Sequence, residues 1–149
     1  MLCQRRFFLN MSSALQRMHH VGFVVENIEA TMPGFLKSLN ATWDEKIFHD
    51  PIQSVKVAFL STSGTDVQIE LVQPMGDRNP VSAFLAKGGG IHHVCYEVDD
   101  CESAIAAMRQ QKALIVRRPK PAVAFDGRLI AWMLTAEKLL VEFVEKNKR

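Results

Sequence analysis

An internal repeat constrains the fold of this chain more than any other feature of its sequence. Residues 19–27 resemble residues 92–100, since both begin His-His-Val and run through apolar residues to acidic or amide ones. The offset between the two segments is 93 − 20 = 73 residues. An ordered match of this kind is typical of a duplicated supersecondary unit whose copies share a core.

Two further matches follow in the same order. Residues 59–62 resemble residues 132–135 at the same offset of 73. Residues 67–73 resemble residues 139–145, with an offset of 142 − 70 = 72. Three matches in one order, at nearly one offset, indicate duplication rather than chance.

The expected secondary structure repeats as well, and gives βαβββ in each half. Asn27 and Asp100 are predicted to cap the two helices, and Asn79-Pro80 to open a linker helix that ends at Gly88-Gly89-Gly90. The expected strands are 19–25, 42–48, 55–61 and 67–73 in the first half, and 91–98, 113–117, 129–135 and 139–145 in the second.

The predicted fold is therefore α+β, with two paired βαβββ modules that form a curved, largely antiparallel eight-stranded cup. As one structural domain, the chain divides into an N-terminal extension (1–17), a first module (18–78), a linker helix with its glycine loop (79–90) and a second module (91–149). The extension has no acidic residue, so a mitochondrial-type leader and a loose extension both remain open.

Composition excludes several classes of function. Lys+Arg total 18 and Asp+Glu total 16, a balance too even for nucleic-acid binding by bulk charge. No apolar run approaches the roughly 18 residues that span a membrane. Three cysteines without CxxC spacing are typical of reduced thiols, so a cytoplasmic location is expected.

The repeat also places chemical groups at matched positions. Each half has histidine near the start of its first strand and one glutamate, Glu70 or Glu142, inside an apolar last strand. Burying a carboxylate without a partner is costly, so two histidines and two glutamates brought together favour a divalent-metal site. The alternative is that the glutamates face solvent and the histidines only pack. His49 and Asp50 have no repeat partner and are interpreted as loop residues.

On these residues the chain resembles the vicinal oxygen chelate superfamily, also called the glyoxalase, bleomycin-resistance and dioxygenase superfamily, and within it the methylmalonyl-CoA epimerases. The resemblance implies His20, Glu70, His93 and Glu142 as ligands of Co, Ni, Mn or Zn, and a homodimer. The segments that carry it are 18–22, 68–74, 79–85, 89–94 and 140–143.

Such a site predicts proton removal α to a carbonyl, with the ion acting as a Lewis acid. Glu142 is the expected base and Glu70 its pseudo-symmetric counterpart. The resemblance favours a methylmalonyl-CoA-like acyl thioester as substrate. The cations expected near its coenzyme A phosphates are Arg117, Arg118, Lys120 and Arg128.

Three alternatives remain open at this stage. Return of the proton to the neighbouring carbon would give a glyoxalase I-type lactoylglutathione lyase. Some proteins of this fold bind antibiotics without any chemistry. An Fe(II) extradiol dioxygenase would need two histidines and one carboxylate, which four candidate ligands fit less well.

Overall fold

The computed structural model describes residues 17–76 and 79–147, so the extension predicted for residues 1–17 lies, except for Arg17, outside the described residues. The first half contains β1 (Arg17–Val24), α1 (Ile28–Leu39), β2 (Ala41–Trp43), β3 (Phe48–Asp50), β4 (Val55–Thr62) and β5 (Gln68–Pro74). Helix α2 (Pro80–Ala86) follows. The second half contains β6 (Gly90–Val98), α3 (Cys101–Arg109), β7 (Leu114–Pro121), the short 3-10 helix η1 (Val123–Phe125), β8 (Leu129–Leu134) and β9 (Leu140–Glu145).

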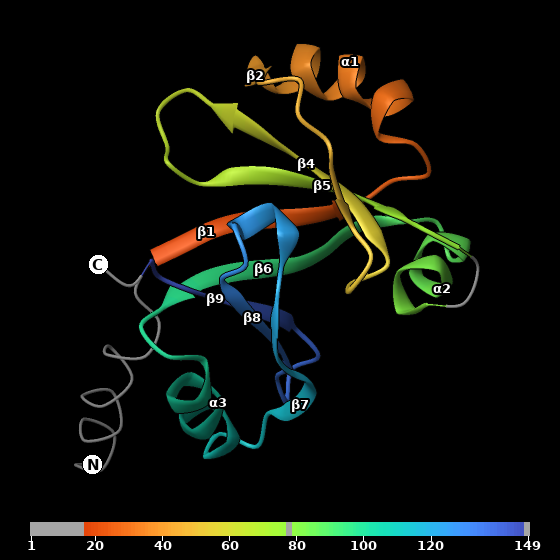
Figure 1. Ribbon diagram of the computed structural model, residues 1–149. Coiled ribbons are helices and arrows are strands. Elements are labelled where there is room, and N and C mark those ends of the chain that lie inside the picture. Colours follow the sequence, from red (N-terminus) through yellow and green to blue (C-terminus); the bar gives the residue numbers. More distant parts are fainter. Residues whose placement is uncertain (1–16, 77–78, 148–149) are drawn as a thin grey trace, which may run out of the picture.

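All strands join one sheet in the order β2-β4-β5-β1-β6-β9-β8-β7, with β3 paired to β4 beside this path. Strands β1 and β6 are antiparallel at the centre, β1–β5 and β6–β9 are parallel, and the other pairings are antiparallel. Figure 1 shows α1 and α3 toward opposite ends, with β1 and β6 side by side between them. The predicted α+β, largely antiparallel cup is confirmed, with one strand more than expected.

Two of the expected strands were wrong in extent. The strand expected at 42–48 is divided into β2 and β3, because Asp44 accepts a hydrogen bond from the Lys46 amide (3.1 Å) and Glu45 adopts a left-handed conformation (φ 62°). His49 and Asp50 were expected in a loop, and this was wrong, because both lie in β3. Strand β7 also runs four residues beyond the expected end at Arg117, to Pro121; prolines are tolerated there because β7 is an edge strand.

The helix caps repeat as the sequence predicts. Asn27 and Asp100 each accept a hydrogen bond from a first-turn amide of their helix, at 2.8 and 2.7 Å. A second cap also repeats: Gln73 at the end of β5 and Glu145 at the end of β9 each accept a bond of 3.0 Å from the first residue of α1 and α3. No helix in the described ranges is both long and apolar enough to cross a membrane.

Strand alternation decides which side chains face the cup. Ile69 and Leu71 of β5 belong to the core beneath α1, and Val141 and Phe143 of β9 belong to the core beneath α3. Since neighbouring side chains of a strand point to opposite faces, the glutamates between these residues face the concave side. The sheet thus has one face covered by helices and one that carries the polar groups.

Candidate active site

Four buried side chains meet on the concave face of the sheet. The Nε2 atom of His20 lies 3.3 Å from Glu70 Oε2, 3.0 Å from Glu142 Oε2 and 3.1 Å from His93 Nε2. The Nε2 atom of His93 lies 3.2 and 3.3 Å from the same two carboxylate oxygens. The structure therefore brings together the four residues that the sequence singled out, one histidine and one glutamate from each half.

The register of the central strands explains this convergence. Gly22 of β1 lies between Glu70 of β5 and His93 of β6. In the corresponding row of the other half, Cys95 of β6 lies between His20 and Glu142. Each row therefore places a small residue between a carboxylate and an imidazole.

Gly22 is required for space rather than for backbone conformation. A Cβ atom at this position would lie 2.0 Å from His93 Cε1 and 2.3 Å from its Nδ1, closer than any contact allows. The ring of His93 therefore lies directly over the backbone of β1. Sequence reasoning missed this residue, although a glycine inside a strand is a known signal for a close approach.

Burial and ionic contacts shift the pKa values of the four central residues in opposite directions. Burial lowers the pKa of His20 and of His93, but the contacts with Glu70 and Glu142 outweigh it and raise both values. Burial raises the pKa of each glutamate, but contacts with the two imidazoles outweigh it and lower both values. Both carboxylates are therefore ionised at neutral pH.

A second pair of histidines flanks the first. His19 Nδ1 lies 2.9 Å from His20 Nδ1, and His92 Nδ1 lies 2.9 Å from His93 Nδ1. Burial, and then the adjacent histidine, lower the pKa of His19 and of His92 to about 4. The resemblance did not match these two residues to ligand positions, and the structure places each beside a ligand.

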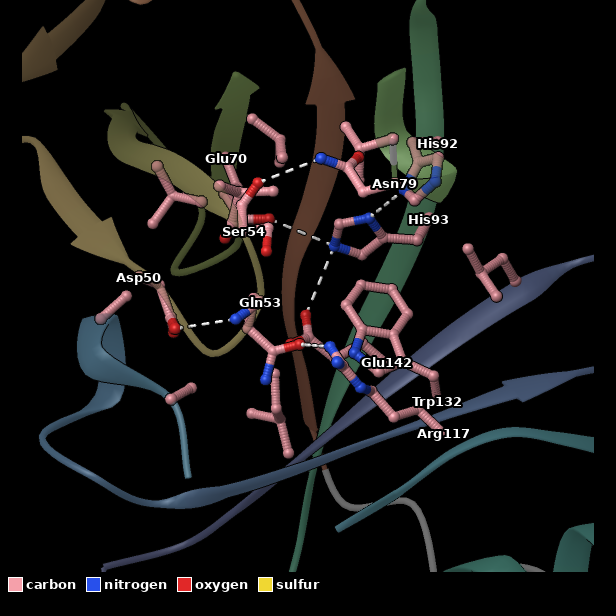
Figure 2. Close-up of a pocket in the computed structure, with 18 of the residues that line it drawn as sticks. Asp50, Gln53, Ser54, Glu70, Asn79, His92, His93, Arg117, Trp132 and Glu142 are labelled. Atoms are coloured by element: carbon pink, nitrogen blue, oxygen red, sulfur yellow. Dashed lines mark hydrogen bonds and ion pairs between the residues drawn. The ribbon is translucent and has the colours of Figure 1, made fainter. Parts of the chain in front are cut away.

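Three of the four residues, Glu70, His93 and Glu142, line a cavity of about 430 Å³. Its first-half wall combines polar side chains with Val55, Val57 and Val72, and its second-half wall is mostly apolar, with Trp132 4.6 Å from the His93 ring. Figure 2 shows Trp132 beside Glu142 and His93. The polar residues of the first-half wall include Asp50, Gln53 and Ser54, Asn79 of the linker also lines the cavity, and the apolar residues of the second-half wall include Val116, Ala122, Ala124, Phe125, Ile130 and Leu140.

Asp50 connects the two walls. Its side chain, 2% exposed, accepts hydrogen bonds from the amides of Ile52 (2.9 Å), Gln53 (3.0 Å) and Val123 (3.0 Å). The last of these holds η1 of the second half against the turn between β3 and β4. Sequence reasoning assigned Asp50 no role, because the residue has no counterpart in the repeat.

Of the four candidate phosphate-binding cations, Arg117 lines the cavity. Its guanidinium donates to Gln53 Oε1 and to the Ile52 carbonyl (3.3 Å), as Figure 2 shows for Gln53. Arg118 pairs with Glu102 (3.4 Å), and Arg128 donates to the Glu145 carbonyl (3.1 Å). Lys120 is exposed and outside the cavity lining.

The four central residues fit a divalent ion. Donor atoms about 2.0–2.2 Å from one ion lie about 3.0–3.5 Å from one another, and the five separations given above are 3.0–3.3 Å. Glu142 Oε2 is buried without an aligned hydrogen-bond donor, although His20 Nε2 is 3.0 Å away. Four donor atoms so close together, one of them a carboxylate oxygen without an aligned donor, point to a common centre, and two imidazoles with two carboxylates suit a transition metal.

Comparison with known proteins agrees with this geometry. Residues 19–132 match the Glyoxalase/Bleomycin resistance protein/Dioxygenase superfamily. The chain belongs to this superfamily. An ethylmalonyl-CoA/methylmalonyl-CoA epimerase of Cereibacter sphaeroides is 30% identical over 119 residues, which cover 78% of this chain and 87% of the relative. A mitochondrial methylmalonyl-CoA epimerase of Dictyostelium discoideum is 29% identical over 134 residues, 87% of this chain and 78% of the relative.

Solved structures of the superfamily share the fold. A methylmalonyl-CoA epimerase from Mycobacterium tuberculosis superposes with a TM-score of 0.80 at 23% identity, covering 92% of each chain. These matches place the chain among enzymes of the glyoxalase superfamily. The two curated relatives described above are epimerases, so the lyase alternative gains no support from them.

Proposed function

We propose that the protein is a divalent-metal-dependent epimerase that removes the proton α to the carbonyl of a methylmalonyl-CoA-like acyl thioester. The observation that carries this proposal is the convergence of four buried donor atoms at one point, beside a cavity that three of their residues line. The 30% identical relative, an ethylmalonyl-CoA/methylmalonyl-CoA epimerase, supports the choice of substrate. His20, Glu70, His93 and Glu142 would hold the ion.

A bound divalent ion would supply Lewis-acid stabilisation of the charge that develops on a carbonyl oxygen when the α proton leaves. The protein supplies the proton transfer. We assign Glu142 as the base, because its Oε2 is buried, ionised and free of an aligned donor. Glu70 is its counterpart from the other half, and a proton returned from that side inverts the α carbon.

The cavity walls suit an anionic acyl thioester. Apolar second-half residues next to Trp132 can exclude water from the reacting carbon, which strengthens electrostatic interactions there. Arg117, held by Gln53 and Ile52, is the proposed partner of an anionic group of the substrate. Homodimer formation and a cytoplasmic location stay predictions.

Exchange with solvent tests the reaction without assuming a product. In deuterated water, methylmalonyl-CoA should gain deuterium at the α carbon only when protein and divalent ion are both present. Isomerisation of a glutathione hemithioacetal without such exchange would replace the epimerase by the glyoxalase alternative. Exchange in neither substrate, together with tight binding of an antibiotic, would overturn the assignment of an enzyme.

A further inference from the structure

His19 and His92 each lie at an irregularity in the pairing of β1 with β6. The ladder between β1 and β6 is irregular at two points, once between Met18 and His20 and once opposite the step from Gly22 to Phe23. The residue without a ladder partner is His19 on β1 at the first point and His92 on β6 at the second. Both irregularities therefore fall on the residue just before a proposed ligand.

A β-bulge changes where a side chain points. Neighbouring residues of a regular strand face opposite sides of the sheet, so their rings would not meet. The bulges turn both unpaired histidines back toward their neighbours, leaving Nδ1–Nδ1 distances of 2.9 Å in each half. The ring planes of each pair are nearly perpendicular, at 84° and 88°. Figure 2 shows the contact between His92 and His93.

Aromatic neighbours fix the outer rings. The ring of His19 is 5.3 Å from that of Phe125, and the ring of His92 is 4.8 Å from that of Phe84. Each outer histidine thus presents one fixed Nδ1 atom to the ligand beside it.

The contact determines which nitrogen of the ligand carries its proton. Only one proton fits between two Nδ1 atoms, and a neutral imidazole has one donor and one acceptor nitrogen. A histidine that binds an ion through Nε2 must carry its proton on Nδ1. That proton then needs an acceptor, and hydrogen bonds of this kind orient metal-binding histidines in proteins.

We propose that His19 and His92 are positioning residues: each accepts the Nδ1–H of the adjacent ligand and so directs the Nε2 lone pair of that ligand at the ion. This proposal rests on the metal site of the proposed function. It assigns to a histidine the part that a carboxylate or backbone carbonyl plays in other metal sites.

Paired substitutions separate this role from simple filling of space. His92→Asn keeps an acceptor near the position of Nδ1, whereas His92→Leu removes it, and the same pair applies at His19. Exposed His49 provides the control variant, His49→Leu. We expect each leucine variant to bind Co²⁺ about 10–100-fold more weakly in a chelator competition, as for other losses of this kind. The asparagine variants and the control should stay within a few-fold of the parent.

A second measurement does not depend on how the variants fold. In the Zn²⁺-loaded parent protein, long-range ¹H–¹⁵N NMR correlations should show the proton of His19 and His92 on Nε2, and that of His20 and His93 on Nδ1. Outer histidines protonated on Nδ1, or leucine variants that are folded and bind Co²⁺ as tightly as the parent, would overturn the positioning role alone. A parent protein that binds neither ion would overturn the proposed function with it.

Discussion

The two halves of the sheet supply the same central groups but cavity walls of different composition. Each half contributes one histidine, one glutamate and an aromatic residue, Phe59 or Trp132, packed on a ligand ring at 5.5 or 4.6 Å. The first-half wall combines polar residues with Val55, Val57 and Val72, whereas the second is mostly apolar and adds η1, whose Phe125 stacks on His20 with ring centroids 6.0 Å apart. We infer that the duplicated halves keep the same residues around the proposed metal site because the four ligands meet at one point. The cavity walls differ because the proposed substrate, an acyl thioester, has no twofold symmetry.

The largest expected effect on the reaction comes from replacing the two carboxylates, which tests whether the two halves have equivalent roles. If each glutamate serves one face of the α carbon, Glu142→Gln and Glu70→Gln should each slow interconversion of the epimers by about 10²–10⁴-fold, the usual contribution of a general base. Each variant should still exchange the α proton of one epimer, and the two variants should favour opposite epimers. Deuterium uptake from each pure epimer, followed by mass spectrometry, measures this directly. Equal loss of exchange from both epimers in both variants would contradict separate roles.

Replacing His20 or His93 tests whether the two halves contribute equally to metal binding. His20→Ala and His93→Ala should each weaken Co²⁺ binding by more than about 100-fold, because loss of a direct ligand should exceed the loss from removing a supporting residue. Circular dichroism should show an intact fold, and His49→Ala, on the exposed surface of β3, should bind normally. Full metal binding by the double variant would remove this site from consideration.

The two rows differ in the small residue between carboxylate and imidazole, which is Gly22 in one and Cys95 in the other. The free energy of unfolding can show whether Gly22 is required. Gly22→Ala should lower the free energy of unfolding by about 1–3 kcal/mol, the usual cost of overpacking, since the added Cβ would meet the His93 ring. Gly34→Ala is the matched control, because nothing lies within 4 Å of a Cβ at this site in α1. That change should be neutral or stabilising by up to about 1 kcal/mol. Urea unfolding that gives both variants the same sign would show that the site near His93 can adjust.

The smallest effect is expected at the contact between the two walls. Arg117→Ala should raise KM for an acyl-CoA substrate about tenfold, equivalent to about 1.4 kcal/mol, with little change in kcat. Arg118→Ala should leave KM unchanged, because Arg118 pairs with Glu102 outside the cavity lining. Steady-state kinetics at constant ionic strength distinguish the two. Equal KM values for both variants would indicate that Arg117 makes no contact with the substrate.

Much of this architecture follows from local and periodic properties of the sequence. The repeat predicted two equivalent halves, the capping residues Asn27 and Asp100 placed the helices, and strand alternation placed Glu70 and Glu142 on the face opposite the helices. These features depend on neighbouring residues or on the period of a strand. They can therefore be read without knowing which strands pair. The exact module boundaries stay a prediction.

The duplicated fold and the identity of the four central residues could therefore be predicted from the sequence alone. The way in which these residues are supported could not be predicted, because it depends on strand register and on contacts between distant segments. The bulges at His19 and His92 exist only in the pairing of β1 with β6, and the need for Gly22 appears only once the His93 ring lies over it. Asp50 accepts a hydrogen bond from the Val123 amide, 73 positions away, a contact that no local pattern encodes.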